Sequence, residues 1–333
     1  MNNCRLTSVL FLIAALTFSS PGLAESCRSG NELDDATRSA LAAAALHDFA
    51  LVTKGDAASL RQSAIPSLAN DFSGIENTVK RNQAALAGSK ATPRPPFLLE
   101  AEGASPIPHA EFYCGVFGKS GQTSDSAVFY LNNLPPGRYG MVILDVAAAK
   151  GSYTVSLILQ QQGSDWKLGN LFVHAAQVGG HDSAWYVARA HDYQSKGQVH
   201  NASLYYLVAI SLASPVSFMS TAATDKLYDD LQKIQPADFP SGGKTADLSA
   251  AGATYKLIGL FPDFVGNDLD LIVRYEIKDI ANTTLAYQTN LAVMKALLTK
   301  FPELRDAFAA VVARAVDPTG HDYGTMLPMK DIK

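Results

Sequence analysis

The side chain best suited to acid–base chemistry in this chain is Asp145, which interrupts the apolar run from Met141 to Ala147. Placing a carboxylate among apolar neighbours costs free energy unless the group forms an ion pair or stays hydrated. Asp145 is therefore either a carboxylate at the rim of a sheet or an acid that faces a ligand. His174, at the end of a later β-rich run, is the second side chain that could act as a general base. The sequence thus offers Asp145 and His174 as candidate catalytic residues.

Aromatic side chains on the same β-rich runs could line a ligand pocket around these groups. Rings that combine a large apolar surface with one polar atom are common walls of small-molecule sites. The candidates for such a pocket are Tyr113, Tyr130, Tyr139 and Trp166.

Other motifs argue against cofactor and metal chemistry. Gly243-Lys244-Thr245 is similar to the end of a phosphate-binding loop, but the loop's first glycine would have to stand at Asp238, whose charge would repel phosphate. Ser241 and Lys244 have the spacing of a serine–lysine catalytic pair, but the two glycines between them disfavour the helix that such a pair requires. Histidines recur beside acids without the spacing that places two metal ligands on one helix face. We therefore expect no cofactor and no metal.

Residues 1–24 have the pattern of a secretion signal. Arg5 supplies a positive start, Leu10 to Phe18 an apolar core, and Gly22-Leu23-Ala24 a cleavage site of small residues. The alternative is a membrane anchor, but an apolar run of about 13 residues is shorter than the roughly 20 that span a bilayer. We expect cleavage after Ala24 and export to the bacterial periplasm or the cell exterior.

The cysteines fit the same compartment. Lipidation of Cys27 would need small residues directly before it, and Glu25 fits such a box poorly, so we expect free export rather than a lipoprotein. Cleavage leaves Cys27 and Cys114, which an oxidising compartment would allow to pair. The alternative is two unrelated thiols, one buried and one at the terminus.

Charge and hydropathy exclude two kinds of partner. The chain has 27 Lys and Arg against 31 Asp and Glu, so its formal charge is −4, without the basic excess of a nucleic-acid-binding protein. No segment after residue 24 is long and apolar enough to cross a membrane. We expect neither nucleic-acid binding nor a transmembrane helix.

Residues 25–178 have the element order of an α+β domain. Apolar residues recur at helical spacing up to about residue 87, and residues 88–96 form a proline-rich linker. β-rich runs with short turns then continue to His174, which predicts antiparallel neighbours. On one of these runs Val155 and Leu157 share one face while Thr154 and Ser156 share the other, so we expect one face to pack and the other to meet water.

Helices followed by a meander that ends in a hairpin over Val155 to Val173 resemble the NTF2-like family of cone-shaped α+β domains. The resemblance implies a curved antiparallel sheet wrapped against the N-terminal helices. It also implies a pocket in the mouth of the cone, which some relatives use for catalysis and many use only for binding. No acid–base signature of the enzymatic relatives occurs here, so no catalytic residue is carried over.

Residues 179–235 have a different pattern. Small and aromatic residues between Tyr186 and Ala209 have the spacing of one tetratricopeptide repeat, with departures at Arg189 and Pro215. One such TPR-like helical hairpin has to dock on the sheet domain or on the C-terminal segment, because a lone repeat leaves apolar faces uncovered. The hairpin is either a structural adaptor or a platform for a peptide or protein partner. Candidate partner-binding residues are Tyr186, Tyr193 and Tyr206.

The remaining chain predicts a small C-terminal unit. Residues 236–252 are polar and glycine-rich, as in a linker. Over residues 253–333 we expect strands at 255–261 and 269–277, helices at 283–299 and 302–315, and a final strand near 321–327, a mixed ββαα(β) arrangement. The fold class of the whole chain is α+β.

Two functions remain in competition. The first is an exported, non-catalytic binding or scaffolding protein, because helical-repeat spacing is combined with missing catalytic signatures. The second is a small-molecule acid–base enzyme of the isomerase or dehydratase type, which would use the cone pocket with Asp145 or His174 as base.

Overall fold

The computed structural model describes residues 25–117, 121–250, 252–266 and 268–333. The predicted signal peptide over residues 1–24 lies outside these ranges. The fold is α+β, as the sequence predicts, with helices and several antiparallel sheets. No helix in the described ranges is long and apolar enough to cross a membrane.

The N-terminal helices form one outer layer. The first begins after Asp34, whose side chain accepts a hydrogen bond from the Thr37 amide, and ends at Gly55 with φ 72°. The predicted helical region is confirmed, and its second half is divided by Pro66 and by the turn at Asp71. The bounds are α1 Asp35–Lys54, α2 Ala57–Gln62, α3 Pro66–Asn70 and α4 Ser73–Leu86.

The main sheet forms the middle layer. Its strands pair antiparallel in the order β1-β3-β6-β7-β8, with β2 beside the far end of β6. The prediction of a linker over 88–96 is therefore wrong in part, because residues 90–93 pair with β6. The bounds are β1 Glu25–Ser29, β2 Lys90–Pro93, β3 Phe97–Ala101, β6 Gly137–Ala148, β7 Gly151–Gln162 and β8 Asp165–Ala175.

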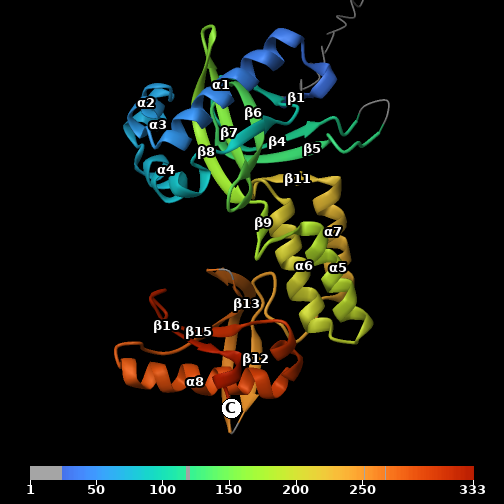
Figure 1. Cartoon of the computed structure of the whole chain (residues 1–333), viewed down its shortest axis with the longest axis vertical. Helices are drawn as coiled ribbons and strands as arrows, with labels where there is room; N and C mark the ends of the chain where they lie inside the picture. The colour runs from blue at the N-terminus through green and yellow to red at the C-terminus, as the bar shows by residue number, and fades with distance from the viewer. Residues whose placement is uncertain (1–24, 118–120, 251, 267) are drawn as a thin grey trace, which may run out of the picture.

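A second sheet covers the other face of the main sheet (Figure 1). Its order is β11-β5-β4, with β4 Ile107–Cys114, β5 Ala127–Leu134 and β11 Met219–Thr221. Phe97 of the main sheet contacts Phe129 of the second, with ring centroids 5.1 Å apart. The expectation that Thr154 and Ser156 meet water is wrong, because both side chains are buried on this covered face.

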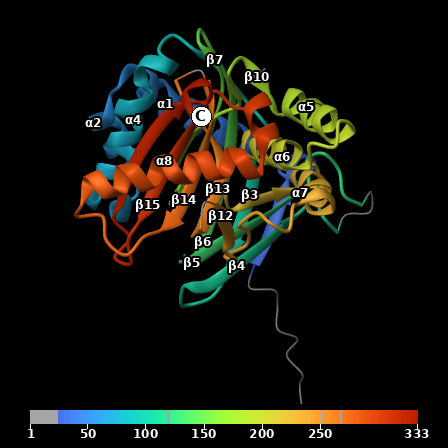
Figure 2. The same cartoon turned by 90° about the horizontal axis from the view of Figure 1, so that it is seen from below.

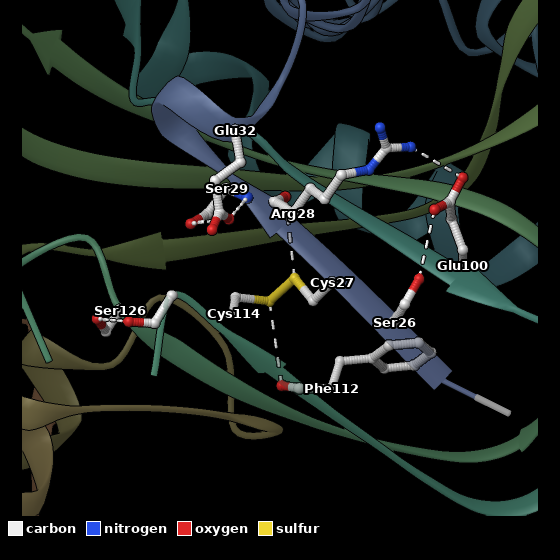
Figure 3. Close-up of a disulfide and its surroundings, with 10 residues drawn as sticks. Ser26, Cys27, Arg28, Ser29, Glu32, Glu100, Phe112, Cys114 and Ser126 are labelled. Atoms are coloured by element: carbon white, nitrogen blue, oxygen red, sulfur yellow. Dashed lines mark hydrogen bonds and ion pairs between the residues drawn. A yellow bond between two sulfur atoms is a disulfide. The ribbon is translucent and has the colours of Figure 1, made fainter. Parts of the chain in front are cut away.

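A disulfide joins the two sheets at one edge. Figure 3 shows the bond between Cys27 on β1 and Cys114 at the end of β4, with Phe112 beside it. The Cα atoms are 5.0 Å apart and 87 residues separate the two positions in sequence. The predicted pairing of these two cysteines is confirmed.

Short strands β9 Gln177–Val178 and β10 His181–Asp182 lead into a helical hairpin of α5 Ser183–Ser195 and α6 Val199–Ala213. Gly197, with φ 74°, makes the turn. The chain then crosses back to the second sheet as β11 before α7 Ala222–Ile234 begins. The hairpin is thus tied to the N-terminal layers through one short strand (Figure 1).

The C-terminal unit is a mixed sheet with one long helix across it (Figure 2). The order is β12-β13-β14-β15-β16, and β14 and β15 are parallel, joined by α8. A helix over 302–315 is wrong beyond Asp306, since the chain makes a short 3-10 helix and then a strand. Residues 246–250 of the expected linker also form a strand, and the predicted final strand is confirmed as β16. The bounds are β12 Ala246–Ala250, β13 Ala253–Val265, β14 Asp268–Glu276, α8 Thr283–Lys300, β15 Ala310–Val316 and β16 Asp322–Pro328.

One continuous apolar core runs from the helical hairpin into the C-terminal sheet. Tyr205 of α6 donates a hydrogen bond from its hydroxyl to the Ala307 carbonyl at 2.9 Å. Of the two docking sites that the sequence leaves open for the hairpin, the main apolar contact is with the C-terminal unit.

His200 links three segments within this core. Its Nδ1 lies 2.6 Å from Glu303 Oε1, and its Nε2 lies 3.1 Å from Asp238 Oδ1. The ring also packs against Phe239 and Phe301, with centroids 4.8 and 4.5 Å away. Asp238 belongs to the segment after α7, and Glu303 belongs to the 3-10 helix Pro302–Asp306. His200 therefore joins the start of α6 to these two segments.

Candidate binding site

The layer between the helices and the main sheet, where the family resemblance implies a pocket, is occupied by apolar side chains. Leu41, Phe49 and Val52 of α1 pack against Leu144 and other main-sheet residues, and all are buried. At Gly140 of β6 a Cβ atom would overlap the Leu41 side chain. The packing of α1 against β6 therefore leaves no room for a Cβ atom at position 140.

The polar group that sequence reasoning missed in this layer is Asp48. Its side chain is buried and accepts a hydrogen bond from Ser63 Oγ at 2.8 Å. Burial raises the pKa of Asp48 to about 6, against the smaller lowering effect of the Ser63 hydrogen bond. The signal was present in the sequence, because position 48 falls on the same helix face as Ala45 and Val52.

Asp145 lies on the opposite face of the main sheet and is paired. Arg94 binds both of its oxygens, with Nε at 3.1 Å from Oδ1 and 3.0 Å from Oδ2, and Nη2 at 2.7 Å from Oδ1. The pairing arises because β2 runs beside β6 with Thr92 opposite Asp145, which brings Arg94 alongside. Asp145 is therefore a paired, half-exposed carboxylate at the rim, the first of the two alternatives.

His174 and Asp145 do not form a catalytic pair. Both lie opposite Thr154 in the sheet register, one on each side of β7, so their side chains share a face. Two strand spacings separate them by about 10 Å. His174 Nε2 donates a hydrogen bond to the carbonyl oxygen of Ser211 on α6, at 2.8 Å. Each group thus has its own hydrogen-bond partner, Arg94 for Asp145 and the Ser211 carbonyl for His174.

His174 lies instead in a groove between the N-terminal layers and the helical hairpin, which we call the junction groove. Its volume is about 590 Å³, and its walls come from β5, β8, α6, α7 and the segment around β11. Among the described residues that line it, none is Asp, Glu, Lys or Arg. The residues that line the groove include Tyr130, Phe172, His174, Leu207, Ile210, Ser217, Met219 and Tyr228.

A neighbouring hollow of about 400 Å³ extends the junction groove towards β13. It shares His174, Leu207 and Ser211 with the groove and reaches Phe261 and Phe264. The two hollows thus form a continuous lining from the N-terminal layers, past α6, to the C-terminal unit, and this lining is mainly apolar apart from Asp263 at its far end.

Of the four predicted pocket residues, only Tyr130 lines the junction groove. Tyr113 is exposed and donates a hydrogen bond to Glu111 at 2.6 Å. Tyr139 is buried, with its hydroxyl donating to the Pro135 carbonyl, and Trp166 packs on the core under the helices. The structure does not bring these side chains together.

The three predicted partner-binding tyrosines are core residues. Tyr186, Tyr193 and Tyr206 are 3%, 2% and 1% exposed. Their hydroxyls contact the Val178 carbonyl, the Asp306 carbonyl and a ring nitrogen of a neighbouring histidine. The expectation that they form a partner surface is corrected: the repeat-like spacing identifies side chains that hold the hairpin to its neighbours.

No group of three or more His, Cys, Asp and Glu side chains able to hold a metal ion occurs in the part of the chain that the structure describes. Comparisons with protein-family models, with curated proteins and with solved structures found no match. The fold and the site define an α+β chain with a groove at the junction of its units.

Proposed function

We propose that this protein is an exported, non-catalytic binding protein whose junction groove holds an uncharged, apolar segment of a peptide or protein partner. The observation that carries the proposal is the groove itself, an open hollow whose walls combine apolar and aromatic side chains with hydroxyl groups, and in which none of the described lining residues is Asp, Glu, Lys or Arg. A charged segment would lose water there without gaining an ionic partner.

The walls suit such a segment. Tyr130 and Tyr228 are 48% and 49% exposed at the groove, although large aromatic side chains usually bury most of their surface. Aromatic side chains of this kind are the usual anchors of peptide and protein interfaces. Ser217 adds a hydroxyl that can pair with the backbone of a bound segment.

Export is supported by the disulfide between Cys27 and Cys114, since such bonds persist in oxidising compartments. The NTF2-like resemblance is supported by the order of N-terminal helices and antiparallel strands. The TPR-like resemblance is supported by the buried small residues Ala190 and Ala202 and by the turn at Gly197. The competing acid–base enzyme has less support, because Asp145 and His174 are held by separate partners.

The proposal is tested by selecting binders from a random heptapeptide library on the exported chain with its disulfide intact. We expect enriched peptides to be uncharged and apolar. Tyr228→Ala should weaken their binding about tenfold or more, as loss of an aromatic anchor does.

The matched control is Tyr287→Ala, because Tyr287 is also a helical tyrosine and is 42% exposed, but lies on α8 away from the groove. This variant should bind like the wild type. A library that yields only charged peptides, or peptides that both variants bind equally well, would contradict the proposal.

A further inference from the structure

The outer edge of strand β8 is unpaired where it lines the junction groove. β8 is the last strand of the main sheet and has β7 on one side only (Figure 1). Val173 and His174 line the groove, and His174 and Ala175 line the neighbouring hollow towards β13. The same short stretch of β8 therefore runs along both hollows.

The hydrogen-bonding pattern shows which backbone groups of this stretch point outward. In an antiparallel pair, residues that exchange backbone hydrogen bonds alternate with residues whose N–H and C=O groups point away from the partner strand. The Ala176 N–H donates to the Ser152 carbonyl at 2.8 Å, which continues the register of β7 and β8 by one step. Ala175 and Val173 are therefore positions whose N–H and C=O groups point away from β7.

The side chain of Asn170 gives an independent check of this alternation. Its Oδ1 accepts the Leu171 N–H at 2.8 Å, so β7 does not use that N–H. Leu171 lies two residues before Val173 and has the same orientation in the strand, and the extra residue Gly169 shifts the register only before this stretch. Among the described residues, none forms a hydrogen bond with the backbone N–H or C=O group of Val173 or Ala175.

Another part of the same edge is already paired within the chain. The Leu168 N–H donates to the Ser63 carbonyl, and the Leu168 carbonyl accepts the Ile65 N–H, both at 2.9 Å. The segment between α2 and α3 thus pairs with β8 as a short parallel strand would. A strand added over Val173 and Ala175 would continue along an edge that the protein itself begins to cover.

The walls beside this edge suit the side chains of an added strand. Side chains of such a strand alternate between the two faces of the sheet. Phe172 and His174 share the face towards the second sheet and α6, where Phe172 contacts Phe218 with ring centroids 5.3 Å apart and His174 is bound to Ser211. Every second side chain of the added strand would therefore meet this aromatic wall, where none of the described groove residues is Asp, Glu, Lys or Arg.

We propose that the junction groove binds its partner as an extended strand, which forms backbone hydrogen bonds with the outward N–H and C=O groups of Val173 and Ala175. Strand addition of this kind satisfies the unpaired groups of a free sheet edge. A helical segment would satisfy its own backbone groups and leave those of β8 unpaired. This binding mode rests on the proposed function of the groove and adds the conformation of the bound segment.

The test is an N-methyl scan of a selected heptapeptide, with its affinity for the disulfide-intact wild-type chain measured by calorimetry. Each peptide variant carries one N-methylated amide, which removes one N–H donor and leaves the side chains unchanged. We expect affinity losses of about tenfold or more at alternate amides, because only every second N–H of an added strand points towards β8. The intervening amides are the matched controls and should tolerate methylation within about threefold.

Val173→Pro tests the same contact from the protein side. Proline removes the outward N–H of residue 173 and takes no hydrogen bond from the pairing with β7, and such edge positions are where sheets tolerate proline. We expect peptide binding about tenfold weaker than in the wild type. Val173→Ala keeps the N–H and is the matched control, which should bind within about threefold of the wild type.

The outcomes separate strand pairing from the proposed function. Uniform tolerance of N-methylation, or losses spaced by three to four residues as on a helix, would overturn strand pairing alone if Tyr228→Ala still weakens binding of the same peptides. If no library peptide binds in a way that depends on Tyr228, both the proposed function and strand pairing fail. If Val173→Pro does not fold, the N-methyl scan decides, because it uses the wild-type chain.

Discussion

Replacing Asp48 with asparagine should stabilise the protein at neutral pH. The carboxyl is 3% exposed between α1 and the main sheet, and burial raises its pKa from 3.8 to about 6. A difference of about two pKa units corresponds to about 3 kcal/mol. Asparagine is close to aspartate in size, keeps an oxygen that can accept the Ser63 hydrogen bond, and carries no charge.

The sign follows from the two protonation states. The pKa of Asp48 is higher in the folded protein, so ionisation of this carboxyl destabilises the fold. Below about pH 4 the group is protonated in both states and imposes no penalty. Its contribution to stability falls as the pH rises from about 4 to about 6, and the full penalty of about 3 kcal/mol is present at neutral pH.

The assay is urea unfolding of the wild type and Asp48→Asn at about pH 4.5 and about pH 7.5. The stability difference between the two proteins should grow by about 2 kcal/mol between these pH values in favour of the variant. Asp165→Asn is the control, because Asp165 is exposed, and its difference from the wild type should be the same at both pH values. An Asp48→Asn difference that does not change with pH would refute the reasoning.

Three further predictions concern stability. Cys27→Ser should lower the free energy of unfolding by about 4 to 5 kcal/mol, because the lost disulfide spans 87 residues. Wild-type protein with an unchanged urea midpoint after reduction would contradict this. Gly140→Ala should lower stability by about 1 to 3 kcal/mol, because the new methyl group overlaps Leu41, and an unchanged melting temperature would argue against the tight packing of α1 on β6. His200→Ala should lower the free energy of unfolding by about 2 kcal/mol or more, because it leaves two carboxylates without a hydrogen-bond partner and a cavity between two phenyl rings. An unchanged unfolding temperature in calorimetry would show that His200 does not stabilise the contact between these segments.

Local patterns predicted much of the secondary structure. Helical spacing up to Leu86 predicted the N-terminal helices, and turn residues between the β-rich runs predicted the antiparallel strands. The pairing of Cys27 with Cys114 was predicted from the cysteines that follow residue 24. The helix predicted over Pro302–Ala315 is wrong beyond Asp306, because the strand that pairs in parallel with β14 is largely buried on both faces. Such a strand has a continuous apolar run rather than a period of two, and short runs of this kind fit a helix equally well.

The candidate site was less predictable, because it depends on which face each side chain occupies. The two catalytic candidates were correctly placed on strands, but the Arg94 partner of Asp145 lies 51 residues earlier in the chain. A shift of one residue in strand register moves a side chain to the opposite face. The side chain of Tyr130 therefore lines the junction groove, whereas Tyr139 is buried between the two sheets and Trp166 packs on the core under the helices.

The repeat-like spacing of the hairpin shows a related limit. Spacing identifies which side chains are buried, but it does not identify what buries them. Tyr193 packs in the shared core and donates its hydroxyl to the carbonyl of Asp306, 113 residues later in the chain. Only the tertiary contact separates a structural tyrosine from a partner-binding one.

The most direct test of the proposed function is a crystal structure of the exported chain with a peptide selected from the library. We predict that the peptide lies in the junction groove and contacts Tyr130 and Tyr228, with an apolar side chain between β8 and α6. A peptide bound elsewhere, such as on the C-terminal unit, with the junction groove unchanged, would contradict the account.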